Sequence, residues 1–161
     1  QGIDADIIVN VQGDEALVNP EYIDKAVDSL VNSSRADVAI LVNPFNKKNS
    51  PSDIKVVLNE DDEIMYLSRT DIPSDARTDS PQMLKAYHIV PFRKDFLLQF
   101  AKWGKTELEQ IEFNEYLRIL EKGYKIQAVH VESDAVSVDT EQDLELVRSK
   151  MKIDKIGQLY L

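Results

Sequence analysis

The stretch "DIIVNVQGDEALVNPEYI", residues 6–23, decides the fold class. It begins with a short, nearly continuous apolar run at 7–11, which is typical of a strand covered on both faces in a parallel sheet. Asn19, Pro20 and Glu21 then have the residue types of an N-cap and the first two helical positions. Apolar residues follow at helical spacing. A strand that leads into a helix in this way predicts an α/β fold.

The segments downstream continue the alternation of strands and helices. "ADVAILV" at 36–42 predicts a buried strand, so the first helix should connect two parallel strands in a βαβ unit. Two strand-like runs around 59–62 predict a hairpin over 53–69. We further expect a surface loop at 70–82 and a strand at 83–92, with Pro91 at its end or on a sheet edge. Two helices should follow, one at 94–103 and one from the Thr106 capping box to Gly123. The chain should then form a strand at 124–132 and a short strand and helix over 136–151, with Thr140 as N-cap of that helix.

The composition excludes several classes of protein. A formal net charge of −10 and the lack of a dense Lys/Arg cluster argue against a nucleic-acid partner. No apolar run approaches the ~20 residues of a membrane span, so we expect no membrane insertion. The chain has no cysteine, which excludes disulfides and thiolate metal sites and fits a cytoplasmic protein. Its five glycines form neither a dinucleotide fingerprint nor a P-loop.

Two carboxylates stand where predicted strands end. Asp14 follows the first strand in "VQGDE", and Asp139 follows a later one in "VSVDT". Ligands of α/β sheets bind beyond the carboxyl ends of parallel strands, so both residues are candidates for a site. Each also has a structural interpretation, because Asp is common in turns and a carboxylate before a helix interacts favourably with the helix dipole.

Four blocks of the sequence carry a resemblance to a known family. "IVNVQGDEALVNPEYI", "IKVVLNEDDEIMYLSRTDIP", "WGKTELEQIEFNEYLRILEKGYKI" and "VSVDTEQDLELV" resemble, in the same order, the 3-deoxy-manno-octulosonate cytidylyltransferases, or CMP-Kdo synthetases. The resemblance implies transfer of CMP from CTP to an acidic sugar, with Mg²⁺ as cofactor and pyrophosphate as product, for lipopolysaccharide or capsule biosynthesis. It also implies a homodimer and a Rossmann-like nucleotidyltransferase fold with a mixed sheet.

The resemblance covers the chain to about residue 150 and describes a partial domain. Family members begin with an Arg- and Lys-containing loop for the CTP triphosphate and with the first sheet strands, and neither is found in this sequence. We therefore expect 1–161 to be one partial nucleotide-sugar transferase domain, with its N-terminal strands missing and an inserted dimerisation hairpin at about 53–92. Such a chain is expected to be inactive by itself.

The resemblance also implies roles for individual residues. Asp14 and Asp139 match metal-binding, catalytic positions, and Mg²⁺ is typically held by one or two carboxylates together with phosphate oxygens and waters. Gln12 matches a position that contacts the sugar acid. Its alternative is a strand-end amide that satisfies backbone groups.

Three further residues are predicted to bind substrate. Arg69 matches a position near the sugar carboxylate, which a planar guanidinium binds bidentately, although it could equally be a solvated loop residue. Lys55 is a weaker candidate of the same kind, and a surface lysine on a strand is the favoured interpretation. Glu109 matches a glutamate associated with the sugar hydroxyls, and it is also the N3 residue of the capping box with Thr106.

The sequence departs from the family in "MLKAYHIVPFR". Ala86 occupies the position of the family histidine, and His88 lies two residues later. Ser74 replaces a tryptophan that usually follows the "SRxxIP" block. These changes keep two alternatives open: a relative that activates another acidic sugar, such as an amino-Kdo or a sialic-acid-like compound, and a non-catalytic remnant that binds sugar or forms dimers.

Overall fold

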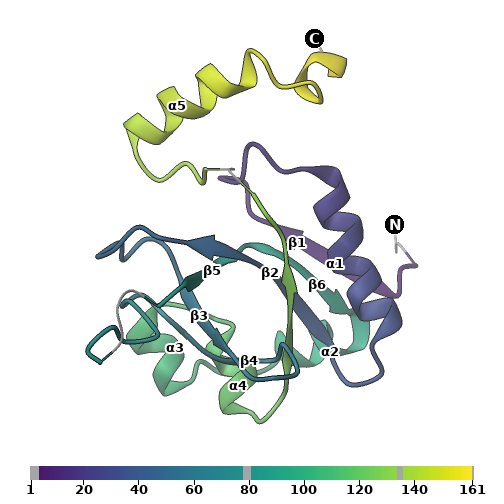
Figure 1. The fold of residues 1–161 in the computed structure, drawn as a ribbon. Coiled ribbons are helices and arrows are strands. Elements are labelled where there is room, and N and C mark those ends of the chain that lie inside the picture. Colours follow the sequence, from purple (N-terminus) through teal and green to yellow (C-terminus); the bar gives the residue numbers. More distant parts are fainter. Residues whose placement is uncertain (1–3, 78–80, 134–135, 161) are drawn as a thin grey trace.

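The computed structural model describes residues 4–77, 81–133 and 136–160. Seven strands in this part of the chain form one mixed sheet, with five α-helices around it (Figure 1). In chain order the elements are β1 (Ile7–Val11), α1 (Pro20–Asn32), β2 (Val38–Phe45), β3 (Lys55–Leu58), β4 (Ile64–Ser68), β5 (Met83–Tyr87), β6 (Ile89–Arg93), α2 (Lys94–Phe100), α3 (Glu107–Glu112), α4 (Leu117–Glu121), β7 (Ile126–His130), α5 (Glu141–Met151) and the 3₁₀ turn η1 (Gly157–Tyr160).

Strand β2 lies at the centre of the sheet. It pairs in parallel with β7 on one edge and antiparallel with the bent pair β5–β6 on the other. Beyond that pair, β3 and β4 extend the sheet from β5, and β1 pairs antiparallel with β6. The predicted βαβ unit is confirmed, because α1 connects β1 and β2, which run parallel, and β6 lies between the two strands.

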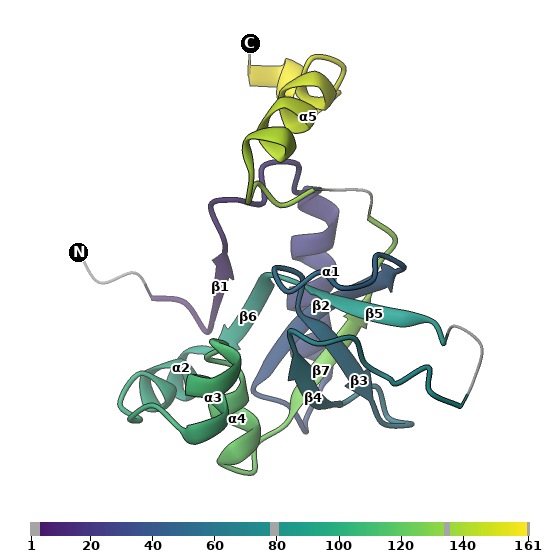
Figure 2. The same cartoon turned by 90° about the vertical axis from the view of Figure 1, so that its left-hand side faces the viewer.

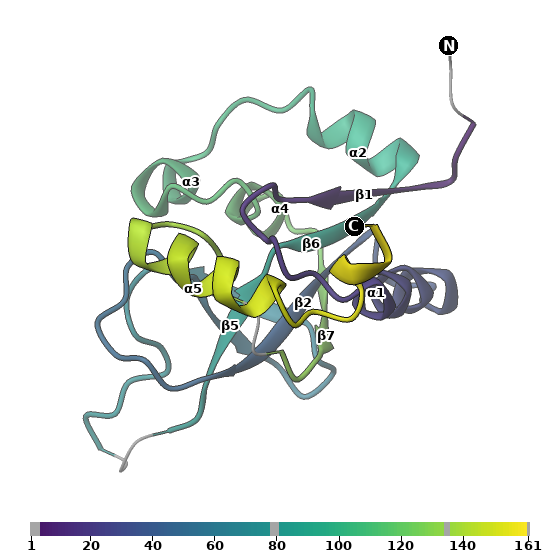
Figure 3. The same ribbon diagram turned by 90° about the horizontal axis from the view of Figure 1, so that it is seen from above.

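Helices cover the two faces of the sheet unequally. α1 packs on one face, where Ala26 and Leu30 join a cluster with residues of β2, β6 and β7. α2, α3 and α4 cover the other face, where Phe96 and Leu117 belong to the larger core. Figure 3 shows α1 and α2 on opposite sides of β6. α5 projects beyond the end of the sheet (Figure 2). Among the described helices, none is long and apolar enough to cross a membrane.

Local sequence signals are confirmed at several element boundaries. The Asn19 side chain accepts a hydrogen bond from the Glu21 N–H at 3.0 Å, so it caps α1. The predicted hairpin is β3–β4, and the Asn59 carboxamide accepts bonds from its turn. Thr140 caps α5, and its side chain accepts a hydrogen bond from the Asp143 N–H.

Three predicted elements are wrong. The helix expected up to Gly123 is broken into α3 and α4, because Phe113 adopts a left-handed conformation with φ 49°. Segment 136–139 forms no strand with the described chain, and the Val138 N–H bonds the Asp14 carbonyl instead. Pro91 lies inside β6 opposite Val9, in a part of β6 that β2 does not pair with.

One expectation about burial is also wrong. β1 is not covered on both faces, because Ile8 and Val11 are exposed at this edge of the sheet. In the predicted dimerisation hairpin, Val56, Ile64 and Leu67 are buried within the chain and Met65 is exposed. The dimer therefore stays a prediction that rests on the resemblance alone.

Candidate functional site

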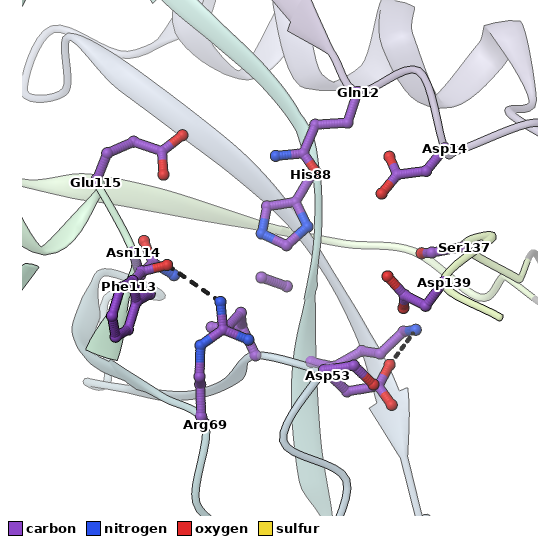
Figure 4. Close-up of a pocket in the computed structure, with 14 residues that line it drawn as sticks. Gln12, Asp14, Asp53, Arg69, His88, Phe113, Asn114, Glu115, Ser137 and Asp139 are labelled. Atoms are coloured by element: carbon purple, nitrogen blue, oxygen red, sulfur yellow. Dashed lines mark hydrogen bonds and ion pairs between the residues drawn. The ribbon is translucent and has the colours of Figure 1, made fainter. Parts of the chain in front are cut away.

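One polar pocket of about 270 Å³ opens where the loops after β1 and β4, the bend between β5 and β6, and the break between α3 and α4 converge. This volume is near the lower end of the ~300–1,000 Å³ usual for ligand sites. We call it the main pocket (Figure 4). Its lining consists of Gln12, Asp14, Ser52, Asp53, Ile54, Arg69, Lys85, Ala86, His88, Phe113, Asn114, Glu115, Ser137 and Asp139.

The two predicted metal carboxylates line this pocket together. Figure 4 shows Asp14 and Asp139 on the same side, with both carboxylates directed into the pocket. Their segments are tied by two bonds: the Val138 N–H donates to the Asp14 carbonyl at 3.1 Å, and Ser137 Oγ donates to Glu15 Oε1 at 2.9 Å. Residues far apart in the sequence are thus brought to one position, as predicted.

One oxygen of this pair is available for a ligand. Asp14 Oδ1 is buried and has no hydrogen-bond partner among the described residues. A buried carboxylate oxygen without a donor is costly unless a ligand satisfies it. Within the described ranges, no group of three or more His, Cys, Asp or Glu side chains forms a complete metal cage. Two carboxylates with open positions fit Mg²⁺, which takes its remaining ligands from substrate phosphates and water.

Neighbouring Glu15 is part of the support for this loop and not of the pocket lining. Burial raises the pKa of its carboxyl, and the hydrogen bond from Ser137 opposes that rise. A carboxyl that accepts a bond from the 137–139 segment holds the two halves of the Asp14–Asp139 site together.

Arg69 lines the pocket, but its guanidinium is already engaged. Nε donates to the Glu112 carbonyl at 2.7 Å, Nη1 to the Pro51 carbonyl at 2.7 Å and Nη2 to the Phe113 carbonyl at 3.1 Å. The alternative of a freely solvated loop residue is therefore wrong. The guanidinium supplies a fixed positive charge to the pocket and ties three segments together, and these bonds use three of its five N–H donors.

Lys55 does not line the main pocket, and it is not a surface lysine. Its side chain is fully buried, and Nζ donates to the carbonyls of Ser50, Asp53 and Arg69 at 2.7, 2.8 and 2.6 Å. Burial lowers the pKa of this ammonium, and nearby Asp71 opposes the shift. Lys55 therefore supports, from behind, the backbone that presents two pocket residues.

Lys85 is the pocket cation that the sequence analysis missed. Its Nζ bonds Asp53 Oδ1 at 2.8 Å, and both side chains are largely buried. Burial alone would raise the pKa of Asp53, but the bonds from Lys85 and Ser50 outweigh it and lower that pKa. A lysine on a strand gives no sequence signal for such a role, although Lys85 is adjacent to the divergent Ala86.

The shifted histidine remains in the pocket. Ala86 and His88 are two residues apart on the bent β5–β6 strand, and side chains two apart on a strand face the same side. His88 lies close to Tyr116, with ring centroids 6.1 Å apart. Burial lowers its pKa, and the charges of Glu115 and Asp14 oppose that shift. Gln12 also lines the pocket, and its backbone N–H bonds the His88 carbonyl at 3.4 Å.

Glu109 lies outside the main pocket. Its carboxylate forms a buried pair with Arg118 and accepts the Thr106 N–H at 3.1 Å, so the capping-box interpretation is correct. The hydrogen bonds from Arg118 lower the pKa of this carboxyl. The glutamate that lines the main pocket is Glu115, which follows the break between α3 and α4. A sequence interpretation that assumed one continuous helix could not find it.

The charges that line the main pocket are predominantly acidic. Four carboxylates, Asp14, Asp53, Glu115 and Asp139, face two cations, Arg69 and Lys85. An anionic ligand would be repelled by this excess unless a bound cation compensated it. The arrangement therefore suits a metal ion together with an anionic, hydroxyl-bearing ligand.

Comparison with known proteins gives consistent matches. A family model described as "Cytidylyltransferase" matches residues 1–126. A 3-deoxy-manno-octulosonate cytidylyltransferase from Geotalea uraniireducens is 37% identical, and the alignment covers 93% of this chain and 65% of that protein. The corresponding protein from Fusobacterium nucleatum is 32% identical over 94% of this chain and 63% of its own length. The chain thus spans just under two thirds of the curated relatives it matches.

Solved structures agree with these sequence matches. A CMP:2-keto-3-deoxy-manno-octonic acid synthetase complexed with CTP superimposes with a TM-score of 0.87 at 30% identity, covering 93% of this chain and 63% of that one. An inositol-1-phosphate CTP transferase from T. maritima has a TM-score of 0.60 at 15% identity, which shows likeness of fold alone. The predicted nucleotidyltransferase type of α/β fold is therefore confirmed.

Proposed function

The chain belongs to the cytidylyltransferase family, and from that premise we propose that it carries the metal and acceptor part of an active site. The proposed reaction transfers CMP from CTP to a hydroxyl of an acidic sugar, 3-deoxy-manno-octulosonate, and releases pyrophosphate. The relatives with this name and the structure complexed with CTP support the choice of reaction and nucleotide.

The observation that carries the proposal is the pairing of Asp14 and Asp139 in one pocket, with Asp14 Oδ1 buried and unbonded. Transfer of a nucleotidyl group brings a nucleophilic oxygen toward a negatively charged phosphate. That approach requires positive charge where two carboxylates would otherwise repel both reactants. A carboxylate pair of this kind is therefore useful when it holds a divalent cation.

The residues present fit Mg²⁺, with Asp14 and Asp139 as its protein ligands. A bound Mg²⁺ would neutralise the phosphate and lower the pKa of the attacking hydroxyl. The backbone bond between Val138 and Asp14 keeps the two carboxylates on the same side of the pocket, so both reach one ligand. Proximity of this kind is what converts two separate reactants into an oriented pair.

The other pocket residues bind and orient the acceptor. Gln12 and Asn114 offer both donors and acceptors to sugar hydroxyls, and Glu115 accepts from them. Lys85 and Arg69 supply the positive charge that an acidic sugar needs. Either cation can contact the sugar carboxylate, because the bonds of Arg69 use three of its five N–H donors and the bond of Lys85 to Asp53 uses one of its three.

One observation favours a second acceptor. Ala86 and His88 both line the pocket, so the imidazole occupies a different position along the strand from that of the family histidine. A bulky ring further along the pocket changes the space available to the sugar. An amino-Kdo or a sialic-acid-like sugar is therefore the alternative acceptor within the same mechanism.

Assembly and location follow the family. We expect a homodimer built on the β3–β4 hairpin, where Met65 is an exposed apolar side chain on the edge strand β4. A cytoplasmic location is expected because the chain has no cysteine and the proposed reaction uses CTP.

The test uses the full-length protein and measures pyrophosphate release from CTP over a Mg²⁺ titration, with 3-deoxy-manno-octulosonate or sialic acid as acceptor. Asp14→Asn and Asp139→Asn keep the side-chain shape and remove the charge. Each should lower kcat by about a hundredfold or more, since metal stabilisation of transition-state charge is worth several kcal/mol. The double variant should be little worse than the worse single variant, because the two residues act as one unit.

Asp24→Asn is the matched control, because Asp24 is an exposed carboxylate on α1 outside the pocket. It should leave turnover unchanged. Near-wild-type turnover by Asp14→Asn at saturating Mg²⁺ would refute the metal assignment. Activity with sialic acid alone would keep the mechanism and change the acceptor. A full-length protein that binds sugar or forms dimers but does not turn over would favour the non-catalytic remnant.

A further inference from the structure

Phe113 has a backbone conformation that its side chain does not favour. It ends α3 with φ 49° and ψ 48°, in the left-handed region. Glycine or asparagine normally occupies such a position, and a bulky residue there costs of order 1 kcal/mol or more. The Phe113 side chain is 80% exposed, so burial in the core does not compensate this strain.

The surrounding structure holds this conformation in place. Arg69 Nη2 donates to the Phe113 carbonyl at 3.1 Å and Nε to the preceding Glu112 carbonyl at 2.7 Å. On the other side, the Asn114 N–H donates to the Glu109 carbonyl at 3.3 Å. Hydrogen bonds on both sides hold the backbone, so the point from which the ring projects is set before any ligand arrives.

The ring lies at the boundary of two hollows. Phe113, Asn114 and Glu115 line both the main pocket and an adjoining pocket of about 420 Å³, which Lys105, Glu109 and Gln110 complete. In Figure 4 Phe113 lies across the main pocket from Asp14 and Asp139. A ligand that meets the carboxylate pair with its reacting hydroxyl therefore extends toward this ring.

We propose that Phe113 is a substrate-contacting residue whose ring packs against the C–H face of the acidic sugar in the main pocket. The ring of a sugar has hydroxyls at its rim and apolar C–H groups on its faces. Aromatic side chains contribute large apolar contact area to ligand pockets, while a few polar groups fix the orientation. This inference rests on the proposed function, because the acidic sugar is the ligand that the family implies.

The inference makes a prediction that a purely structural role does not make. Phe113→Gly relieves the left-handed strain and removes the ring. The thermal midpoint should rise by about 2–4 °C, as expected for about 1 kcal/mol in a domain of this size. The affinity for the sugar should fall about three- to tenfold, the value of a lost aromatic contact. Higher stability with weaker binding is the signature of a ring kept for its ligand.

The experiment is titration calorimetry of the chain with 3-deoxy-manno-octulosonate or sialic acid in Mg²⁺, together with thermal unfolding of each variant. Phe113→Tyr keeps both the ring and the strain, so affinity should stay within about twofold of wild type. Ile111→Ala is the control for an exposed apolar side chain, because Ile111 is 64% exposed on the same helix and outside both pockets. It should leave affinity unchanged.

The outcomes separate the two proposals. Wild-type affinity in Phe113→Gly would overturn the contact and leave the proposed function standing. An equal loss of affinity in Ile111→Ala would also overturn it. If the wild-type chain binds neither sugar, both the proposed function and this inference fail. A lower thermal midpoint in Phe113→Gly would show that the ring stabilises the fold, which would refute the assignment of the strain to ligand binding.

Discussion

Replacement of the buried Lys55 by methionine tests how the pocket is supported. Methionine fills nearly the same volume but removes the ammonium that donates to the carbonyls of Ser50, Asp53 and Arg69. The side chain has no exposed surface, so water cannot replace these bonds without disturbing the packing. Two segments, the loop before β3 and the end of β4, would lose their common donor.

The magnitude follows from the number and type of these bonds. Hydrogen bonds to a charged group contribute about 1.5–3 kcal/mol each, so three of them have an upper bound of about 4.5–9 kcal/mol. The cost of burying the ammonium offsets several kcal/mol of that sum. We expect Lys55→Met to lower the free energy of unfolding by about 3–5 kcal/mol, a large part of the ~5–15 kcal/mol typical of a domain.

Urea unfolding followed by far-ultraviolet circular dichroism measures this loss. With a slope of about 2 kcal/mol per molar, the midpoint should fall by about 1.5–2.5 M while the slope stays constant. Lys125→Met is the matched control, because the Lys125 ammonium is also hydrogen-bonded, to the carboxylate of Glu63, but its side chain is 50% exposed. The control should lose about 1 kcal/mol or less. Equal losses in the two variants would refute the reasoning.

Two further predictions concern the side chains of His88 and Glu109. The pKa of His88 is lower in the folded chain than in the unfolded chain. As the pH drops below about 6.5, the unfolded chain therefore takes up the His88 proton before the folded chain does, and the free energy of unfolding falls. His88→Gln should remove part of that loss, seen as a smaller difference between urea midpoints at pH 7.5 and pH 5.5; an unchanged difference would exclude His88 as its source. Glu109→Gln should weaken the buried pair with Arg118 and cost about 1–3 kcal/mol in urea unfolding, while sugar affinity by calorimetry stays at the wild-type value. A selective loss of affinity would restore Glu109 as a substrate ligand.

Much of the local structure is determined by the sequence alone. The start of α1 follows from the Asn19 cap and Pro20 at N1, and the structure begins the helix at the same residue. The hairpin β3–β4 and the Thr140 capping box were predicted for the same reason. Caps, turns and periodicity depend on residues only a few positions apart, so a single sequence contains the information needed to predict them.

The predicted site residues also divide into those that the sequence could identify and those whose role depends on the whole fold. Asp14 and Asp139 could be named because each follows a strand-like segment and lies in a block that resembles the family, and the structure brings them into one pocket. Lys55 and Glu109 were assigned to substrate, yet the donors and acceptors that engage them come from other segments. Burial and pairing of a charged side chain depend on the whole fold, so the sequence around a lysine or glutamate does not reveal them.

Strand order and the break at Phe113 were decided only by the tertiary structure. β6 separates β1 from β2, although it follows both in the chain, because pairing partners are chosen by packing and not by sequence distance. The capping box and Gly123 predicted one helix, but the chain breaks at Phe113, whose backbone is left-handed and whose carbonyl accepts a hydrogen bond from Arg69. Asn114 and Glu115 follow this break and line the pocket, and a contact between segments so far apart in the chain is not encoded by any local pattern.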